Sequence, residues 1–167
     1  MNKRWEILPI DEKKQILLEK NLHISSSLAE ILTRKNLDEN SAKLFLNPTK
    51  IPYHDPFLLK DMEKACQRLL SALKNKEKIC IYGDYDVDGV SSTALLMTVF
   101  TKLGFNIDYY LPDRHSEGYG LHIESLQKLI PKYDLLITVD CGITALDEVD
   151  YAKDKIDMII TDHHLSR

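Results

Sequence analysis

The sequence has few of the features that mark secreted, zinc-binding or membrane proteins. It contains three cysteines, Cys66, Cys80 and Cys141, among 167 residues, and none of them forms a C-x-x-C pair. An odd count at wide spacing argues against a disulfide framework and a cysteine-based zinc site, and favours reduced thiols in a cytoplasmic protein. No apolar run approaches the roughly 18 residues of a membrane span. We therefore expect a cytoplasmic protein with no membrane partner.

An excess of positive charge is also absent. Lysine and arginine number 22 against 26 aspartates and glutamates, which gives a formal net charge of −4. The chain as a whole has no electrostatic attraction for nucleic acid. A nucleic-acid enzyme is not excluded by this, because bound metal ions can supply positive charge locally.

The first part of the sequence reads as helical. The stretches "DEKKQILLEK", "SSLAEILTRK" and "DENSAKLFL" carry apolar residues at spacings of three and four, with Asp11, Ser25 or Ser26, and Asp38 as candidate N-caps. "NPTKIPYHDPF" contains three prolines and is typical of a stiff connector. We predict a helical N-terminal region with its connector over residues 1–60.

From residue 61 the pattern is that of an α/β domain. A helix is expected from near Asp61, and from Lys78 short apolar runs alternate with helical patterns. The runs are "ICIY", "NIDYYL", "DLLITV" and "DMIIT", and the helical stretches between them are "GVSSTALLMTVFTKLG", "LHIESLQKLI" and "TALDEVDYAKD". Such alternation predicts a doubly wound, mostly parallel sheet over residues 61–167.

Three of these runs are followed directly by groups that can bind metals. They are Asp84, Asp86 and Asp88 after the first, Asp140 after the third, and Asp162, His163 and His164 after the fourth. Parallel strands bring these positions to one edge of the sheet. So many carboxylates together would repel one another without a cation, and hard divalent ions prefer oxygen ligands while imidazole also suits Mn²⁺. The sequence predicts a metal centre at this edge.

Each motif also has a simpler interpretation. Aspartate-rich turns are common as helix caps and solvated loops, and adjacent histidines often lie on loops. "DYDVDG" also matches the opening of an EF-hand calcium loop, but Leu95 occupies position twelve, where that loop needs glutamate, and "KICIY" before it reads as a strand. The EF-hand interpretation fails, and the combination of the three motifs favours the metal centre.

The motifs "IYGDYDVDGVSSTALL", "LPDRHSEGYGL", "ITVDCG" and "ITDHH" resemble, in order, those of the DHH phosphoesterase superfamily. With the helical lead-in "LAEILTRKNLDENSAKLFLNPT", the chain is similar to the RecJ-type exonucleases of that superfamily. The resemblance implies metal-dependent hydrolysis of phosphodiester bonds in single-stranded DNA from 5′ to 3′, in DNA repair and recombination. It implies Mn²⁺, or Mg²⁺ as a substitute, with two ions in the complete enzyme, and repair or recombination proteins as partners.

The resemblance also implies roles for individual residues. His164 would lie beside the scissile phosphate, polarising it or helping to bind metal, and Asp162 would orient a histidine. Asp140 would bridge two ions, and Asp84 would support the first motif or contribute more distantly. The expected catalytic residues are His164 and Asp162, and the expected metal ligands are Asp84, Asp86, Asp88, Asp140 and His163.

The loop "PDRHSEGYG" is expected at the same edge as a substrate-binding segment. Arg114 and His115 could grip a phosphate. Gly118 and Gly120 would let a backbone come close, or would only shape a turn. Tyr119 could stack on a base or lie in the core. The free N–H groups of "GVSS" could face a phosphate, or Ser91 could cap a helix.

The sequence ends three residues after "DHH", whereas the resembled exonucleases continue with a fourth-motif aspartate, a second domain and an OB-fold. We expect an incomplete N-terminal portion, truncated at its C-terminus, with weak or no activity alone. Two alternatives stay open: a non-catalytic remnant or interaction module, and a phosphodiesterase for short oligonucleotides or cyclic dinucleotides. "EGYGL" and the N-terminal helices count against the latter.

Overall fold

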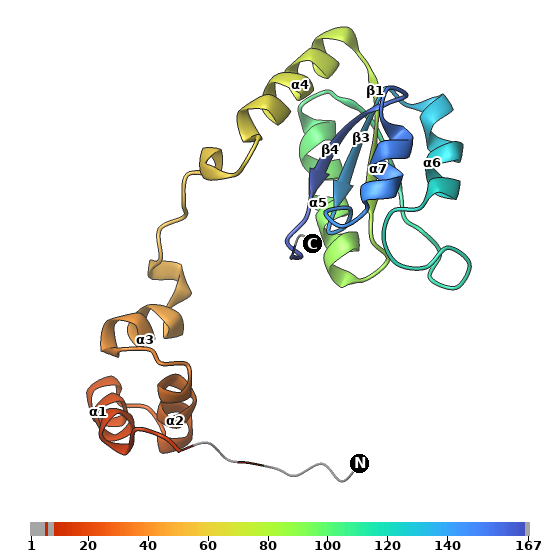
Figure 1. Cartoon of the computed structure of the whole chain (residues 1–167). Coiled ribbons are helices and arrows are strands. Elements are labelled where there is room, and N and C mark those ends of the chain that lie inside the picture. The colour runs from red at the N-terminus through yellow and green to blue at the C-terminus, as the bar shows by residue number, and fades with distance from the viewer. Residues whose placement is uncertain (1–5, 7–8, 166–167) are drawn as a thin grey trace. The chain divides into compact units, whose positions relative to one another are not determined.

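The computed structural model describes residue 6 and residues 9–165, and the chain divides into two compact units, residues 1–55 and 56–167. The division falls in the proline-containing segment between the helices and the sheet (Figure 1). Each unit has its own buried core, so each is described by itself.

The first unit is built from three short helices, α1 (Glu12–Leu22), α2 (Ser26–Arg34) and α3 (Glu39–Leu46), followed by the 3₁₀ turn η1 (Pro48–Lys50). In each helix the residue before the first turn accepts a hydrogen bond from the N–H three positions on, which confirms Asp11, Ser25 and Asp38 as N-caps. The helices bury a small core of Leu18, Ala29, Leu32 and Ala42.

The second unit is a four-stranded parallel sheet with helical crossovers. Its strand order is β2-β1-β3-β4, and every neighbouring pair is parallel, as predicted. Its elements are η2 (Pro56–Leu58), α4 (Met62–Asn75), β1 (Lys78–Gly83), α5 (Val87–Lys102), β2 (Asn106–Tyr110), α6 (Ile123–Leu129), η3 (Ile130–Lys132), β3 (Leu135–Val139), α7 (Leu146–Ala152) and β4 (Asp157–Thr161).

Helices cover both faces of this sheet, with α5 on one side and α6 and α7 on the other (Figure 1). Alternate residues of the central strands face opposite layers. Ile79 and Ile137 belong to a core with α4 and α5, whereas Cys80 and Leu136 pack with α6 and α7. The doubly wound architecture predicted from the alternation of elements is confirmed.

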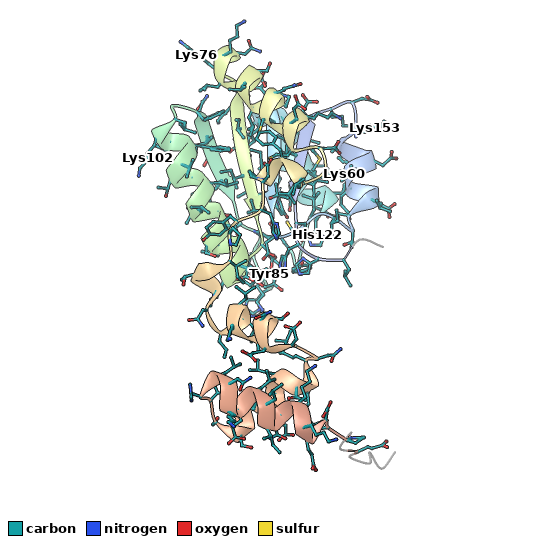
Figure 2. All side chains as sticks on the ribbon, turned by 90° about the vertical axis from the view of Figure 1, so that its left-hand side faces the viewer. Lys60, Lys76, Tyr85, Lys102, His122 and Lys153 are labelled. Carbon is teal, nitrogen blue, oxygen red and sulfur yellow. The ribbon has the colours of Figure 1, made fainter. Side chains whose placement is uncertain are left out.

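The parallel arrangement brings the carboxyl ends of all four strands to one edge. Figure 2 shows Tyr85, which follows β1, and His122, which precedes α6, near this edge, with Lys76 at the opposite end of the unit. None of the helices in the described part of the chain is both long enough and apolar enough to cross a membrane.

Helix α5 begins earlier than the sequence pattern suggested. It starts at Val87, and its N-cap is Asp86, whose Oδ1 accepts the N–H groups of Asp88 and Gly89. The Ser91 hydroxyl donates to the Asp88 carbonyl inside the first turn. Capping by Ser91 is therefore wrong, because a carboxylate one turn earlier already holds the helix start.

Candidate metal centre at the carboxyl edge of the sheet

Asp84, the first residue after β1, carries a buried carboxylate. The residue is fully buried, and both of its side-chain oxygens lack a hydrogen-bond partner within the described residues. Leaving such a group buried and unpaired costs free energy, so a carboxylate in this position needs a partner such as an ordered water or a cation. Asp84 therefore points to a cation at this position.

Asp86 lies two residues further on and is exposed, at the start of α5. The N–H of Gly89, with that of Asp88, holds the pKa of Asp86 below its ordinary value, since both bonds favour the charged form. Only Oδ1 is used for capping. The Asp86 carboxylate also meets the side chain of Asp140, which helps to keep the pKa of Asp86 low.

Asp140 follows β3 and has an unusual backbone. Its φ is 60°, in the left-handed region that non-glycine residues rarely adopt, and its N–H donates to the carbonyl of Thr161 at 3.1 Å. Burial, and then the nearby charge of Asp86, raise the pKa of the Asp140 carboxyl. Strained backbone conformations cluster at functional sites, so this conformation supports a functional role for the Asp140 carboxylate.

The histidines after β4 complete the site. His163 Nε2 lies 2.9 Å from Oδ1 of Asp140, within ion-pair distance but without the geometry of a hydrogen bond. His164 Nδ1 lies 2.7 Å from Oδ1 of Asp162, and this contact raises the pKa of His164. Burial opposes ionisation of Asp162, but hydrogen bonds from the N–H groups of Ile143 and His164 hold its pKa below its ordinary value.

Five of the expected residues come together in two overlapping groups. Asp84, Asp86 and Asp140 form one, and Asp140, His163 and His164 form the other; in each group the candidate ligand atoms lie within 4.8 Å of one another. Asp88 belongs to neither group. It lines, with Asp140 and His163, a cleft between α5 and the ends of β3 and β4.

The loop between β2 and α6 reaches this centre through Tyr119. The ring is half exposed, and its hydroxyl lies 3.4 Å from Nδ1 of His164 and 3.5 Å from the Asp140 carbonyl oxygen. Placement of Tyr119 in the core is thereby excluded. Gly118 and Gly120 have φ values of 82° and 88°, and a Cβ at Gly120 would meet nothing within 4 Å, so the backbone conformation is what requires glycine.

The basic residues of the loop are placed differently from each other. The Arg114 guanidinium lies 5.4 Å from the ring centroid of Tyr85. His115 donates its backbone N–H to Asp113, and it belongs to neither group of candidate ligand atoms found among the described residues. Tyr85, whose ring also meets that of Tyr119 edge to face, was not singled out from the sequence, because an aromatic residue between aspartates carries no signal of its own.

The remaining residue that sequence reasoning missed is Glu117. Its carboxylate accepts hydrogen bonds from Tyr110, Ser125 and Lys128, which come from β2 and α6. The glutamate lies inside the quoted loop motif, but its partners are 7 to 11 positions away and follow no common spacing. Only the folded chain reveals them.

Residues 78–167 match the family model described as the DHH family, N-terminal domain. The chain belongs to the DHH family. A relative from Bacillus subtilis (strain 168), named single-stranded-DNA-specific exonuclease RecJ, is 42% identical over 164 residues, which cover 96% of this DHH-family chain and 21% of the relative. The chain thus spans about a fifth of the length of that relative.

Solved structures of RecJ from Thermus thermophilus share the fold. One, in complex with Mn²⁺, has a TM-score of 0.69 and 26% identity, and covers 98% of this chain and 23% of that one. Another, in complex with Mg²⁺, has a TM-score of 0.59 and 25% identity, and the match covers 96% of this chain and 20% of that one. The oxygen-rich cluster of this DHH-family chain, with its unpaired buried Asp84, fits a hard divalent cation of the same kind.

Proposed function

We propose that this chain carries the metal site of a nuclease that hydrolyses phosphodiester bonds in single-stranded DNA from the 5′ end, as part of a RecJ-type exonuclease. One observation carries the proposal. The buried carboxylate of Asp84, which accepts no hydrogen bond from the described residues, lies beside Asp86 and Asp140 at the carboxyl edge of a parallel sheet, in a chain similar to proteins named single-stranded-DNA-specific exonucleases. That edge is where open α/β sheets bind ligands.

The proposed ligands are Asp84, Asp86, Asp140 and His163. Asp140 belongs to both groups of candidate ligand atoms, which supports a bridging role between two ions, Mn²⁺ or Mg²⁺. Asp88, which lines the neighbouring cleft with Asp140 and His163, is proposed as a further ligand. When bound, such ions lower the pKa of a water molecule and neutralise the charge that develops on the phosphate.

Asp162 and His164 have a separate proposed role. Asp162 accepts from Nδ1 of His164, which fixes the ring. The other ring nitrogen, Nε2, lies 3.5 Å from the Tyr119 hydroxyl, at the limit of a hydrogen bond, and can take a further partner. We assign that partner as an oxygen of the scissile phosphate. The hydrogen bond to Asp162 raises the pKa of His164 and so favours the form that can donate to the phosphate.

The loop residues would hold the strand. Tyr119 is half exposed beside His164, so its ring is available to a base next to the scissile bond, and Arg114 is available to a phosphate. Gly118 and Gly120 shape the turn that presents Tyr119. His115 would act on the strand further from the metals, since it belongs to neither candidate ligand group of the described residues.

The experiment is a Mn²⁺ titration by calorimetry on the wild-type chain, Asp140→Asn and Asp147→Asn. Asp147 is an exposed aspartate at the start of α7 and serves as the matched control. The same samples digest long single strands labelled at the 5′ or the 3′ end, and a dinucleotide. His163→Asn and His164→Asn are titrated and assayed in parallel.

Mn²⁺ binding that Asp140→Asn weakens and Asp147→Asn leaves unchanged is the expected result. His163→Asn should weaken binding, whereas His164→Asn should spare it and reduce cleavage. Loss of label from the 5′ end first supports the proposed polarity. Preferential cleavage of the dinucleotide would instead identify a small-nucleotide phosphodiesterase, and binding of no metal by the wild-type chain would contradict the proposal.

A further inference from the structure

The loop of residues 111–122 brings Tyr119 to the metal centre although few of its side chains are buried. Between Asp113 and Gly118 it folds on itself, because the N–H groups of Glu117 and Gly118 both donate to the carbonyl of Asp113. Those contacts set the shape of the loop but do not attach it to the sheet. The attachment comes from Glu117 and Gly120, on either side of Tyr119.

Glu117 is the most connected side chain of the loop. The Tyr110 hydroxyl lies 2.6 Å from each of its carboxylate oxygens, while Ser125 Oγ and Lys128 Nζ each donate at 3.2 Å. The side chain is only 18% exposed. Its partners come from the last residue of β2 and from two successive turns of α6, so one carboxylate joins three segments of the chain.

Gly120 is held by the strand next to β2. The Tyr82 hydroxyl donates to the Gly120 carbonyl at 2.9 Å in a buried hydrogen bond. Tyr82 and Tyr110 are register partners on β1 and β2, and their rings are stacked with centroids 5.4 Å apart. Two neighbouring tyrosines at the edge of the sheet therefore fix the chain on both sides of Tyr119.

We propose that Glu117 is a positioning residue that clasps the loop to β2 and α6 and so keeps Tyr119 beside His164. It acts through the loop, since its carboxylate contacts Tyr110, Ser125 and Lys128 rather than the acidic cluster. The consequence for substrate rests on the proposed function of the Tyr119 site. The clasp itself does not, because it is a property of the folded chain.

A purely structural role for Glu117 predicts a different pattern of effects. If the carboxylate only stabilised α6, its removal would loosen α6 and the sheet as much as the loop. A clasp predicts a local opening, confined to residues 113–120. Amide hydrogen exchange separates the two, because local and global openings are measured residue by residue.

The test uses the full chain as wild type, Glu117→Ala, Glu117→Gln and Glu124→Gln. Glu124 is an exposed glutamate in the first turn of α6 and is the matched control. A hydrogen bond to a charged group contributes enough that losing this one should speed exchange at residues 113–120 by about tenfold or more in Glu117→Ala. Glu117→Gln keeps an acceptor for Tyr110, so its rate of loop exchange should lie between those of wild type and Glu117→Ala. The rate in Glu124→Gln should equal that of wild type.

A double-mutant cycle with Tyr110→Phe sharpens the result, because phenylalanine keeps the ring stacked on Tyr82 and loses only the hydroxyl. Exchange in Glu117→Ala with Tyr110→Phe should be no faster than in Glu117→Ala alone, because Glu117→Ala already removes the bond between Tyr110 and Glu117 that Tyr110→Phe removes. Loop exchange equal to wild type in Glu117→Ala, or an increase spread equally over β1 and β3, would overturn the proposal.

Binding separates this inference from the proposed function. Mn²⁺ affinity should be unchanged in Glu117→Ala, and affinity for a short 5′-phosphorylated single strand should fall in proportion to the fraction of chains in which the loop remains closed, since only the closed loop holds Tyr119 beside His164. A wild-type chain that binds no DNA would count against the proposed function, while the exchange measurement would still decide the clasp. A loop that is mostly open in Glu117→Ala, together with unchanged DNA affinity, would overturn the positioning role.

Discussion

Gly89 lies so close to the backbone of Asp84 that a Cβ added at Gly89 would sit 2.5 Å from the Asp84 amide nitrogen. The first turn of α5 is thus pressed onto the end of β1. Gly83 contributes to the same approach, since a Cβ there would come within 2.9 Å of the Leu111 side chain and 3.0 Å of the Gly89 carbonyl oxygen. The absence of two side chains allows Asp84 and the N-terminus of α5 to share one small volume.

Gly89→Ala should therefore displace Asp84 and the start of α5 from each other and so disturb the metal centre. The methyl group must push α5 away from β1, because the atoms it meets are backbone and cannot rotate aside. We expect a loss of about 1–3 kcal/mol in the free energy of unfolding and strongly weakened Mn²⁺ binding, measured by denaturant unfolding and calorimetry. Val90→Ala, on the exposed next position, is the control; equal Mn²⁺ affinity in Gly89→Ala and wild type would show that the close approach is dispensable.

The sheet was predictable because local patterns report it directly. "DMIIT" marks β4 residue for residue, and the parallel order follows from the need for a helix between consecutive strands. The start of α5 was placed too late because "DYDVDG" reads as a loop. The choice of Asp86 as cap depends on one carboxylate turning back to two N–H groups, which the pattern of apolar residues does not encode.

The sequence predicted which residues form the site, but not how their side chains are arranged in it. Knowing that parallel strands share an edge was enough to bring Asp84, Asp140 and His163 together. It did not distinguish Asp84, which is buried in a candidate ligand group, from Asp88, which is exposed in the adjoining cleft. That difference depends on side-chain direction after the strand ends, and on the glycines that admit the close approach.

Asp140→Asn and Asp140→Ala should differ in a way that separates charge from backbone strain. Asparagine adopts the left-handed region more readily than alanine, so Asp140→Asn keeps the fold and removes only the ligand charge. Asp140→Ala loses both, and should be less stable than Asp140→Asn by about 1 kcal/mol in thermal or denaturant unfolding. Both should lose Mn²⁺ affinity. Equal stability of the two variants would show that φ 60° carries no cost here.

Arg68 joins α4 to the opposite end of the sheet, away from the metal centre. Its guanidinium donates to Glu77 and Asp157, each at 2.6 Å, and the Arg68 side chain is 24% exposed. Arg68→Met keeps much of the apolar stem and removes both ion pairs. Since Asp157 is largely exposed and screened by solvent, we expect a loss of about 1–2 kcal/mol in unfolding free energy rather than more.

The control for Arg68 is Lys64→Met, an exposed position on the same helix. It should change stability little, and both variants should bind Mn²⁺ as the wild type does, since neither touches the carboxyl edge. A drop in Mn²⁺ affinity in Arg68→Met at a temperature where it is fully folded would mean that the position of α4 reaches the metal site.

The loop that holds Tyr119 should loosen in acid. Hydrogen bonding from Tyr110 holds the pKa of Glu117 below its unfolded value of 4.5, so the ionised clasp contributes its full stability above that value. The contribution is lost as the pH falls through the lower folded pKa. Lys128 stays charged throughout this range. Asp113 lies in the same loop and also has a lowered pKa, because it accepts hydrogen bonds from Ser116.

Comparison of wild type with Glu117→Gln isolates the Glu117 contribution, because Asp113 is present in both. We expect the free energy of loop opening, from amide exchange at residues 113–120, to differ by a constant amount between the two proteins above pH 4.5. Below it the difference should shrink, as the wild-type carboxyl becomes protonated and comes to resemble the amide. A difference that stays the same down to pH 3, or grows, would mean that the Glu117 charge plays no part in holding the loop.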